Sequence, residues 1–488
     1  MDKIWLKRYP SYVPAEIDLN AYGSLVDVYR ESIDKFRDRP AYSNLGRTLS
    51  YGELDEFVTQ FATYLTKVLG MKKGDRIAIM MPNLLQYPVV LFAAIRAGLI
   101  IVNTNPLYTA RELKHQLNDS GAVAIVVLDN FAHTLEKIID ETAVKHVITT
   151  SIGDMAGFPK LLIINFVVRY IKKMVPPYAI RGCVRFRDTL MTRGLYSFED
   201  ADLGHEDIAF LQYTGGTTGV AKGAMLTHRN MIANLLQAHA WTANDLVPGE
   251  EVVITALPLY HIFALLANGL FAMRMGARNI LITNPRDLPA FVRELSKQPF
   301  SFITGVNTLY NALLHTPGFD KLDFSQLKIV LGGGMAVQRG VAEPWQKVTG
   351  TTLLEAYGLT ETSPAAAINP LDIDGYNGFI GLPISSTEIS IRDENNKEQP
   401  LGERGELCIR GPQVMKGYWQ RPEETAAAID AEGWFHSGDI ATMNEEGFIA
   451  IVDRLKDMIL VSGFNVYPNE VEEVLAAHPK VLEAGVIG

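Results

Sequence analysis

The chain has 488 residues, enough for about two to four structural units, because a single hydrophobic core stops growing at about 250 to 300 residues. Its formal net charge of −10 argues against general nucleic-acid binding, since a polyanion would meet no overall positive field. Its only cysteines, Cys183 and Cys408, exclude a disulfide framework and a zinc cluster and favour a reducing compartment.

Targeting and membrane-spanning patterns are also missing from this sequence. The first residues, MDKIWLKRYP, lack the apolar core of a secretory signal. The longest apolar stretches, Leu84 to Ile95 and Phe263 to Met273, are too short to span a bilayer and are typical of buried core helices. We therefore expect a soluble cytoplasmic protein with no nucleic-acid partner.

Residues 76 to 127 alternate between strand and helix patterns. RIAIMM predicts a strand, Leu84 to Ala97 a helix closed by a glycine, and LIIV a second strand. Thr109 and Glu112 form a capping box that opens a helix to about Asn118, and AVAIVV predicts a third strand. The β-α-β-α-β order with buried strands indicates a doubly wound parallel sheet.

The segment from Lys160 to Arg193 carries eight basic residues against the single acid Asp188. The basic residues are Lys160, Arg169, Lys172, Lys173, Arg181, Arg185, Arg187 and Arg193. The segment also contains LLIINFVVRYIKKMV, which is apolar with trailing lysines. Two interpretations stay open: an ordinary packed helix with a solvated basic face, or a contact with an anionic membrane surface.

Between residues 213 and 230 the chain reads YTGGTTGVAKGAMLTHRN, a pattern suited to holding phosphates. Its candidate phosphate-binding residues are Thr214, Gly215, Gly216, Thr217, Thr218, Gly219 and Lys222. The glycines let backbone N–H groups approach an anion, the hydroxyls add donors, and the lysine adds a mobile charge. A surface turn is the plain alternative. A P-loop needs Gly-Lys before Ser or Thr, and the chain contains no Gly-Lys pair.

Two further motifs follow in chain order. LPLYHIFA places His261 in an apolar setting, where a lone histidine is more often a core residue than a functional one. LKIVL, the glycines at 332 to 334, a helix around Val341 to Val348 and TTLLEAYG then repeat the α/β rhythm. LEAYGLTETSP, from Leu354, joins an aromatic ring, a hydroxyl and a carboxylate in one short turn, with an ordinary polar turn as the alternative.

After about Gly381 the pattern changes to short alternating strands such as TEISIRD, GELCIRG and GFIAIVDR, which indicate a β-rich subdomain. WFHSGDIA places Asp439 directly after a glycine turn, where its two oxygens can accept from both hydroxyls of a ribose. A buried aspartate that caps the turn is the alternative.

In order and wording, these motifs resemble the adenylate-forming, or AMP-binding, superfamily of acyl-CoA synthetases over nearly the whole chain. The stretches NPLYTARELKHQLNDSGA, the phosphate loop and ITGVNTLYNALL are most similar to bacterial long-chain fatty-acid–CoA ligases. The resemblance implies two steps: a carboxylate attacks the α-phosphorus of ATP to give an acyl-adenylate and pyrophosphate, and the CoA thiol then displaces AMP. ATP, Mg²⁺ and CoA are the implied cofactors and co-substrates.

The resemblance also implies roles for the residues around the phosphates. Lys222, Thr360, Glu361 and His261 are the candidate catalytic residues. Thr360 contacts the α-phosphate, Glu361 is the candidate metal ligand for Mg²⁺, and His261 orients the substrate rather than acting as an acid or base. A fatty carboxylate is already ionised near pH 7, so no general base is needed.

The implied nucleotide contacts come from four places in the chain. Tyr357 and Gly358 lie against adenine, and Gly333 and Gly334 let the backbone approach adenine and the acyl chain, although a tight turn explains those glycines equally well. Asp439 and Arg454 bind the ribose, and Lys456 is the pivot between the domains. The segment from Ser462 to Tyr467 lines the pantetheine tunnel.

The implied fold is α/β, with a large AMP-binding domain over residues 1–453. That domain holds two doubly wound α/β subdomains to about residue 380 and a β-rich subdomain over about 381–453. Residues 454–488 are the hinge and a truncated start of a small α+β domain. The family's late catalytic lysine has no match, since the last lysines are Lys456 and Lys480. We therefore expect impaired adenylation unless the sequence is a fragment.

Two alternative functions remain open. A medium-chain or aryl acid–CoA ligase is the enzyme alternative, and a non-catalytic nucleotide-binding or membrane-associated remnant is the alternative of another class. A homodimer and a peripheral location on the inner face of the membrane are also left open.

Overall fold

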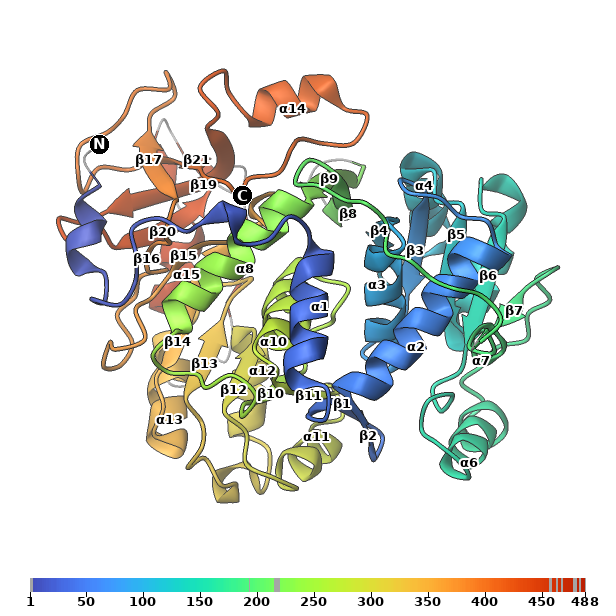
Figure 1. The fold of residues 1–488 in the computed structure, drawn as a ribbon. Helices are drawn as coiled ribbons and strands as arrows, with labels where there is room; N and C mark the ends of the chain where they lie inside the picture. The colour runs from blue at the N-terminus through green and yellow to red at the C-terminus, as the bar shows by residue number, and fades with distance from the viewer. Residues whose placement is uncertain are drawn as a thin grey trace.

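The computed structural model describes residues 3–192, 194–214, 220–455, 459–461, 464–466, 468–476, 481 and 484–487 (Figure 1). Within these ranges the chain forms two large sheets of mainly parallel strands and a smaller antiparallel sheet. No described helix has the length and apolar character needed to cross a membrane.

The first large sheet has the strand order β7-β6-β5-β3-β4-β8-β9 and is parallel except for the last pair. Its strands are β3 (Arg76–Met80), β4 (Ile100–Asn103), β5 (Ala124–Leu128), β6 (His146–Thr150), β7 (Val184–Arg185), β8 (Ile208–Thr214) and β9 (Lys222–Thr227). The predicted β-α-β-α-β unit is confirmed. The helix predicted to about Asn118 runs to Ser120, where the left-handed Gly121 ends it.

The second large sheet has the order β16-β15-β14-β13-β12-β10-β11-β1-β2 and is parallel from β14 to β1. Its strands are β1 (Pro40–Asn44), β2 (Arg47–Ser50), β10 (Val252–Thr255), β11 (Arg278–Leu281), β12 (Phe302–Gly305), β13 (Ile329–Gly332), β14 (Leu353–Gly358), β15 (Ala365–Ile368) and β16 (Leu382–Pro383). β13 and β14 carry the predicted strands LKIVL and TTLLEAYG, and the helix between them is confirmed.

The antiparallel sheet contains β17 (Glu388–Arg392), β18 (Gly405–Arg410), β19 (Phe435–Met443) and β20 (Ile449–Arg454), as the alternating pattern predicts. β21 (Ile459–Val461) and β22 (Phe464–Val466) form a separate hairpin. The domain boundary at residues 453 and 454 stays a prediction.

Helices fill the space between the two large sheets and cover their outer faces. Alternate residues of one strand enter different cores: Ile77 packs into the central core, and Ala78 packs against α4 and α5 on the outside. In the second sheet Ile329 faces the central core, and Val330 faces α11 to α13. This arrangement, helices on both faces of each sheet, is the doubly wound fold that the sequence predicts.

The longer helices are α1 (Leu25–Phe36), α2 (Tyr51–Thr63), α3 (Gln86–Arg96), α4 (Ala110–Ser120), α8 (His228–Thr242), α11 (Leu288–Leu295), α12 (Asn307–Leu314), α13 (Arg339–Thr349) and α15 (Pro468–Ala476). The shorter ones are α5 (Ala132–Glu136), α6 (Lys160–Phe166), α7 (Phe186–Thr189), α9 (Ile262–Ala264), α10 (Phe271–Arg274) and α14 (Pro422–Ala428). Two π-helical segments matter below: η6 (Val167–Ile171) continues α6, and η7 (Leu265–Leu270) joins α9 to α10.

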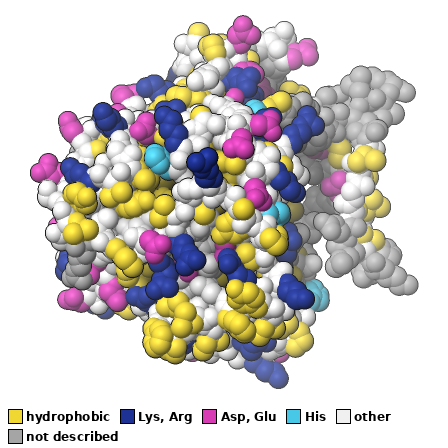
Figure 2. Space-filling model, turned by 90° about the vertical axis from the view of Figure 1, so that its right-hand side faces the viewer, with side chains coloured by type: hydrophobic (Ala, Val, Ile, Leu, Met, Phe, Trp, Pro, Cys, Tyr) yellow, Lys and Arg dark blue, Asp and Glu magenta, His cyan; other side chains and the backbone are white. Residues whose placement is uncertain are grey.

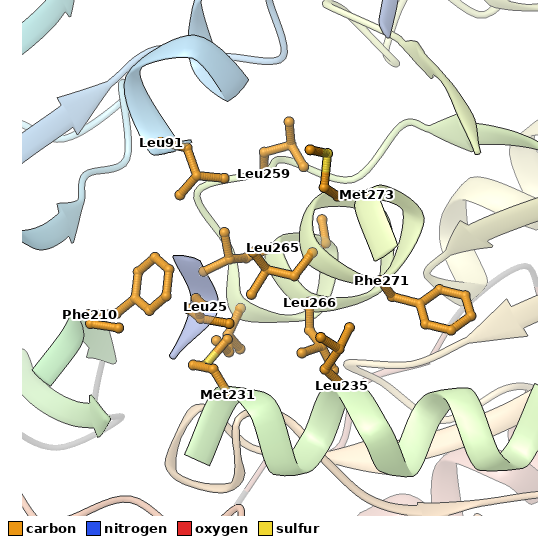
Figure 3. Close-up of a cluster of buried hydrophobic side chains, with 14 of the residues drawn as sticks. Leu25, Leu91, Phe210, Met231, Leu235, Leu259, Leu265, Leu266, Phe271 and Met273 are labelled. Atoms are coloured by element: carbon orange, nitrogen blue, oxygen red, sulfur yellow. The ribbon is translucent and has the colours of Figure 1, made fainter. Parts of the chain in front are cut away.

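The central core is densest where α8 meets the η7 segment (Figure 3). Leu265 and Leu266 lie between Met231 and Leu235 of α8 on one side and Leu259 on the other, and all of these side chains are buried. Thr227 caps α8 through a capping box with Asn230, as the sequence predicts for a helix beginning near His228. This rigid junction fixes the strand ends around which the cavity described next is built.

Candidate active site

One cavity of about 990 Å³ gathers every candidate site residue that the structure describes. Those residues are Thr214, Lys222, His261, Gly333, Gly334, Tyr357, Gly358, Thr360, Glu361, Asp439 and Arg454. They come from both large sheets and from the antiparallel sheet, at positions up to 240 residues apart. The remaining candidates, Gly215, Gly216, Thr217, Thr218, Gly219 and Lys456, lie outside the described residues. The location at the carboxyl ends of parallel strands is typical of ligand sites in open α/β sheets.

Both ends of the phosphate loop are held by α4. Tyr213, at the end of β8, donates its hydroxyl to Asp119 at 2.7 Å, and Arg421 pairs with the same carboxylate at 3.0 Å. On the far side of the loop, the His115 ring Nε2 lies 2.9 Å from the carbonyl oxygen of Ala221. Because His115 and Asp119 are four residues apart, they lie on one face of the helix. One rigid element therefore sets the positions at which the loop begins and ends.

The ribose candidates Asp439 and Arg454 are neighbours across the antiparallel pair β19 and β20. Asp439 is 5 % exposed, accepts a hydrogen bond from the Tyr357 hydroxyl and pairs with Arg454 Nε at 3.2 Å. Burial raises the pKa of Asp439, while the Tyr357 hydroxyl and the Arg454 guanidinium oppose that rise. The sequence predicted a glycine turn before Asp439. The structure instead has a kink at Gly438, which has a φ of 72° inside strand β19.

Glu406, on the neighbouring strand β18, stabilises the kink at Gly438 through hydrogen bonds. One carboxylate oxygen accepts the backbone N–H of Gly438 at 2.9 Å, and the other lies 2.8 Å from His436 Nδ1. The carbonyl of Gly438 in turn accepts the N–H of Leu455, the last residue described before the predicted pivot. Glu406 thus supports the strand segment that carries Asp439, the ribose candidate, and that leads to Leu455, a role that no local sequence pattern indicated.

Glu406, Cys408 and His436 also resemble a metal-binding cluster, since their potential ligand atoms lie within 4.8 Å of one another. Their contacts point to a different role. His436 Nδ1 is already engaged with Glu406, and burial raises the pKa of the Cys408 thiol to about 12, which disfavours the thiolate that a metal requires. We therefore interpret this group as hydrogen-bonded support for the ribose site.

On the phosphate side, Tyr418 contacts two of the candidate catalytic residues. Its hydroxyl donates to Glu361 at 2.7 Å, and Lys222 Nζ lies 4.3 Å from the centre of its ring. Glu361 is 8 % exposed and lines the cavity, so its carboxylate oxygens suit a hard cation such as Mg²⁺, which prefers oxygen ligands. Thr360 begins the short helical turn that also holds Glu361 and lines the same wall.

The strap from Met415 to Trp419 holds Tyr418 in this position. Backbone hydrogen bonds join it to β9, from Met225 N–H to Gly417 and from Trp419 N–H to Gly223. A further bond joins Met415 N–H to the carbonyl of Glu361 at 2.7 Å. Sequence reasoning missed Tyr418, because its partners lie far away along the chain and no local pattern reports such pairing.

His261 faces the cavity from the turn before α9, where its Nδ1 lies 3.4 Å from the backbone nitrogen of Phe263 and caps the helix. The ring is open to the cavity, yet desolvation by the protein around it lowers its pKa, which favours the neutral imidazole near pH 7. The turn is held by Gln212, which donates to the carbonyl of Tyr260 at 2.7 Å. A neutral, fixed histidine matches the predicted orienting role better than an acid–base role.

The cavity also has an apolar part lined from α8, η7 and the second large sheet, which we call the apolar arm. Its described lining includes Ala238, Trp241, Leu266, Phe271, Phe302, Ile329, Leu331 and Ile368. Ile329 and Leu331 are two residues apart on β13, so the arm follows the face of this strand for roughly 7 Å. Trp241 is held by an Nε1–H donated to the Asn369 carbonyl at 3.1 Å and by the Tyr9 ring, 5.1 Å away centre to centre.

Comparisons with known proteins agree with this geometry. The family model described as AMP-binding enzyme matches residues 29–419. The whole chain is 58 % identical to a long-chain-fatty-acid–CoA ligase of Escherichia coli O6:H1 and covers 87 % of it. The chain therefore belongs to the AMP-binding enzyme family, as the motifs predicted.

Solved structures give the same fold. ATP-bound MatB from Rhodopseudomonas palustris has a TM-score of 0.80 at 28 % identity, over 95 % of this chain and 85 % of that one. The anthranilate–CoA ligase AuaEII in complex with anthranoyl-AMP has a TM-score of 0.85 at 23 % identity, over 97 % and 86 %. At that identity the second likeness concerns the fold alone, and both confirm the predicted adenylate-forming architecture.

Proposed function

We propose that the chain activates long-chain fatty acids to their CoA thioesters through an acyl-adenylate, with release of AMP and pyrophosphate. The enzyme class, an AMP-forming acid–CoA ligase, is the one predicted from the motifs and is confirmed by the close relatives. The observation that carries the proposal is the continuity of one cavity, which joins the Asp439 side, the Glu361 side and the apolar arm. A nucleotide and an aliphatic acid can therefore meet there.

ATP and CoA are the expected substrates of this family, and we propose Mg²⁺ as the accompanying cation with Glu361 as its protein ligand. When bound, the cation would neutralise charge on the phosphates. Lys222 adds charge beside them, Thr360 contributes a hydroxyl, and Asp439 and Tyr357 hold the nucleoside. His261 orients the carboxylate at the opening of the apolar arm, so that catalysis rests on positioning and charge stabilisation.

The proposal is tested by incubating the chain with ATP, Mg²⁺, CoA and palmitate and measuring the products. Formation of palmitoyl-CoA with AMP and pyrophosphate is expected, and exclusive release of ADP would contradict it. Lys397→Ala, a change on the exposed hairpin after β17, serves as the matched control for site variants. Thioester synthesis by residues 1–488 would also exclude a non-catalytic remnant, whereas ATP binding without turnover would favour one.

The medium-chain or aryl alternative is decided by kcat/KM along a series of acids. Each methylene buried in the apolar arm should contribute about 0.8 kcal/mol until the arm is full. A steady rise from octanoate to palmitate is therefore expected. A maximum at an aromatic or eight-carbon acid would favour the alternative.

We also propose an anionic membrane surface as a partner, because a long-chain acid partitions into bilayers and has to be collected from them. The basic and apolar segment beginning at Lys160 supports this proposal. A homodimer and a cytoplasmic location at the inner face of the membrane stay predictions.

A further inference from the structure

The surface formed by α6, η6 and their flanking turns has an unusual distribution of side chains. Its large apolar residues are exposed to solvent, with Phe158 at 83 %, Tyr170 at 63 % and Ile171 at 64 %. The remaining exposed apolar residues of this surface are Leu162, Ile163, Phe166 and Met174. We call these seven residues the apolar crest. Within the described parts of the chain, no other segment of this length exposes as many large apolar side chains.

Specific contacts enforce the outward direction of the crest. Asn165 accepts the N–H of Gly153 and donates to Asp154 at 3.0 Å, both on the inner side. Arg169, one turn further on, pairs at 2.9 Å with the buried carboxylate of Asp129. The inner side of the helix therefore carries these polar anchors beside the buried Leu161, and large apolar side chains also cover its solvent side, which an ordinary surface helix keeps polar.

The turns on both sides of the helix are also fixed. Lys160 donates its ammonium to the carbonyl of Gly46 at 3.2 Å, and Arg47 donates to the carbonyl of Met155 at 3.0 Å. After the helix, the Asn130 side chain donates to the carbonyl of Met174 at 2.9 Å. These contacts join the segment to the body of the protein at both ends, so the exposed crest is a stable feature of the fold.

Positive charge lies at the C-terminal end of the crest in a protein that is acidic overall. No Asp or Glu occurs between residues 155 and 187, although the chain carries a formal charge of −10. Lys172 and Lys173, which directly follow the helix, are both exposed. Figure 2 shows yellow side chains gathered at the lower edge of this side of the molecule, where α6 lies in Figure 1, with dark-blue side chains beside them.

The structure also revises the basic segment predicted from the sequence. Arg169 is committed to Asp129, and Arg193 lies outside the described residues. Lys172 and Lys173 remain as the basic residues next to the crest. The exposed side chains of α6 include Leu162, Ile163 and Phe166, so its solvent face is not simply basic, and the membrane contact stays a prediction.

We propose that the apolar crest is a membrane-docking surface that lies in the interface of an anionic bilayer. Leu162, Ile163 and Phe166 enter the acyl-chain boundary, and Lys172 and Lys173 contact headgroup phosphates. An apolar face with lysines at its edge matches the pattern of interfacial helices. A second copy is the less suitable occupant, because a two-fold contact would place the same lysines opposite one another. Its biological purpose, collecting the fatty acid, rests on the proposed function, whereas the docking itself does not.

Co-sedimentation of the full chain with vesicles tests the surface without ATP, CoA or fatty acid. We expect binding to vesicles that contain phosphatidylglycerol, weak binding to pure phosphatidylcholine, and loss of binding in high salt. The double variants Leu162→Gln/Phe166→Gln and Lys172→Gln/Lys173→Gln should each bind roughly tenfold more weakly or less. Leu401→Gln and Lys397→Gln, exposed positions in the loop between β17 and β18, are matched controls that should bind like the parent.

Two further measurements separate docking from folding and from catalysis. Tyr170→Trp should show a blue shift of its emission when anionic vesicles are added. All variants should keep the parent's melting temperature and its rate on detergent-dispersed palmitate. If the parent itself does not turn over palmitate, that result contradicts the proposed function and leaves the vesicle-binding test unaffected. Unchanged vesicle binding in both double variants would overturn the docking surface. The proposal would also be overturned by two results together: the parent is a dimer in light scattering that does not bind vesicles, and the Leu162→Gln/Phe166→Gln change dissociates this dimer.

Discussion

Lys222 and Glu361 face the same part of the cavity and share Tyr418 as a neighbour. Lys222→Ala and Glu361→Ala should each lower the rate of adenylate formation by about 10² to 10³, because each removes charge stabilisation from the phosphates or their cation. Pyrophosphate release in single-turnover experiments measures this step. Rates near those of the parent would place the phosphates elsewhere in the cavity.

Asp439 is the proposed ribose ligand, and Glu406 supports the strand that carries it. Asp439→Ala should mainly raise the KM for ATP, since a ribose contact is made equally in the ground and transition states. Glu406→Gln keeps the shape but weakens the support of the Gly438 N–H, so a smaller rise in the same KM is expected. Steady-state kinetics with varied ATP distinguishes the two variants. A fall in kcat with an unchanged KM would remove both from the ribose site.

Glu355 is buried at the β13–β14 edge and accepts the N–H of Val337 at 3.2 Å. Burial raises its pKa from 4.5 to about 8. Between these two pKa values Glu355 is protonated in the folded chain and ionised in the unfolded chain. The free energy of unfolding therefore falls as the pH rises from about 5 to 8. The free energy of unfolding of the parent protein should therefore fall by on the order of 3 kcal/mol across this pH range.

Glu355→Gln should remove much of this loss, because an amide does not ionise. Thermal unfolding at pH 5 and pH 8 measures the effect as the difference in melting temperature between variant and parent. The melting temperature of the variant relative to that of the parent should be higher at pH 8 than at pH 5. The exposed Glu403→Gln is the control, and an equal pH response in both variants would contradict a buried, protonated Glu355.

At the scale of elements, strand β19 depends on the kink at Gly438. Its φ of 72° is left-handed, and an added Cβ would meet no atom within 4 Å, so Gly438→Ala tests the backbone conformation alone. The substitution should cost about 1 kcal/mol of stability and raise the KM for ATP by misplacing Asp439. Gly70→Ala is a matched control, since Gly70 has a φ of 68° and the same open surroundings. A similar KM change in both variants would exclude a specific role for the kink.

The sequence predicted the elements that depend on local signals and did not predict those that depend on contacts between distant residues. The run from β3 to β5 was predictable, because each hydrophobic period, cap and glycine stop lies within about a dozen residues. The pairing of β1 with β11, Tyr42 opposite Asn279, was not, because no local signal specifies a partner more than two hundred residues away. The outward face of α6 was equally hidden, because the helix is apolar on both sides and only Asn165 and Arg169 decide which side is buried.

The same distinction applies to the candidate site. The motifs supplied Asp439, Glu361 and Lys222, because each lies in a short and recognisable pattern. Tyr418 and Glu406 were missed, since they act only through contacts with residues about 30 to 60 positions away in the chain, Glu361 and Gly438. Sequence therefore predicted the groups proposed to touch substrate, and the structure was needed for the groups that position them.

At the scale of the whole molecule, the depth of the apolar arm should set the preferred chain length. Ala238 is the smallest side chain that lines the cavity from α8, and Ile329 of β13 lines the same cavity. Ala238→Trp should fill part of the arm without touching the nucleotide residues. We expect kcat/KM for palmitate to fall by at least about tenfold while octanoate is affected much less, because only the longer acid loses buried methylenes.

The ratio of kcat/KM for palmitate to that for octanoate is the informative measurement, since it cancels any general loss of active protein. The KM for ATP should stay close to that of the parent, because the Asp439 side of the cavity is unchanged. Equal losses for both acids would mean that the acyl chain does not run along α8 and β13. In that case the apolar arm would have to be assigned to another ligand, and the chain-length preference sought at a different wall of the cavity.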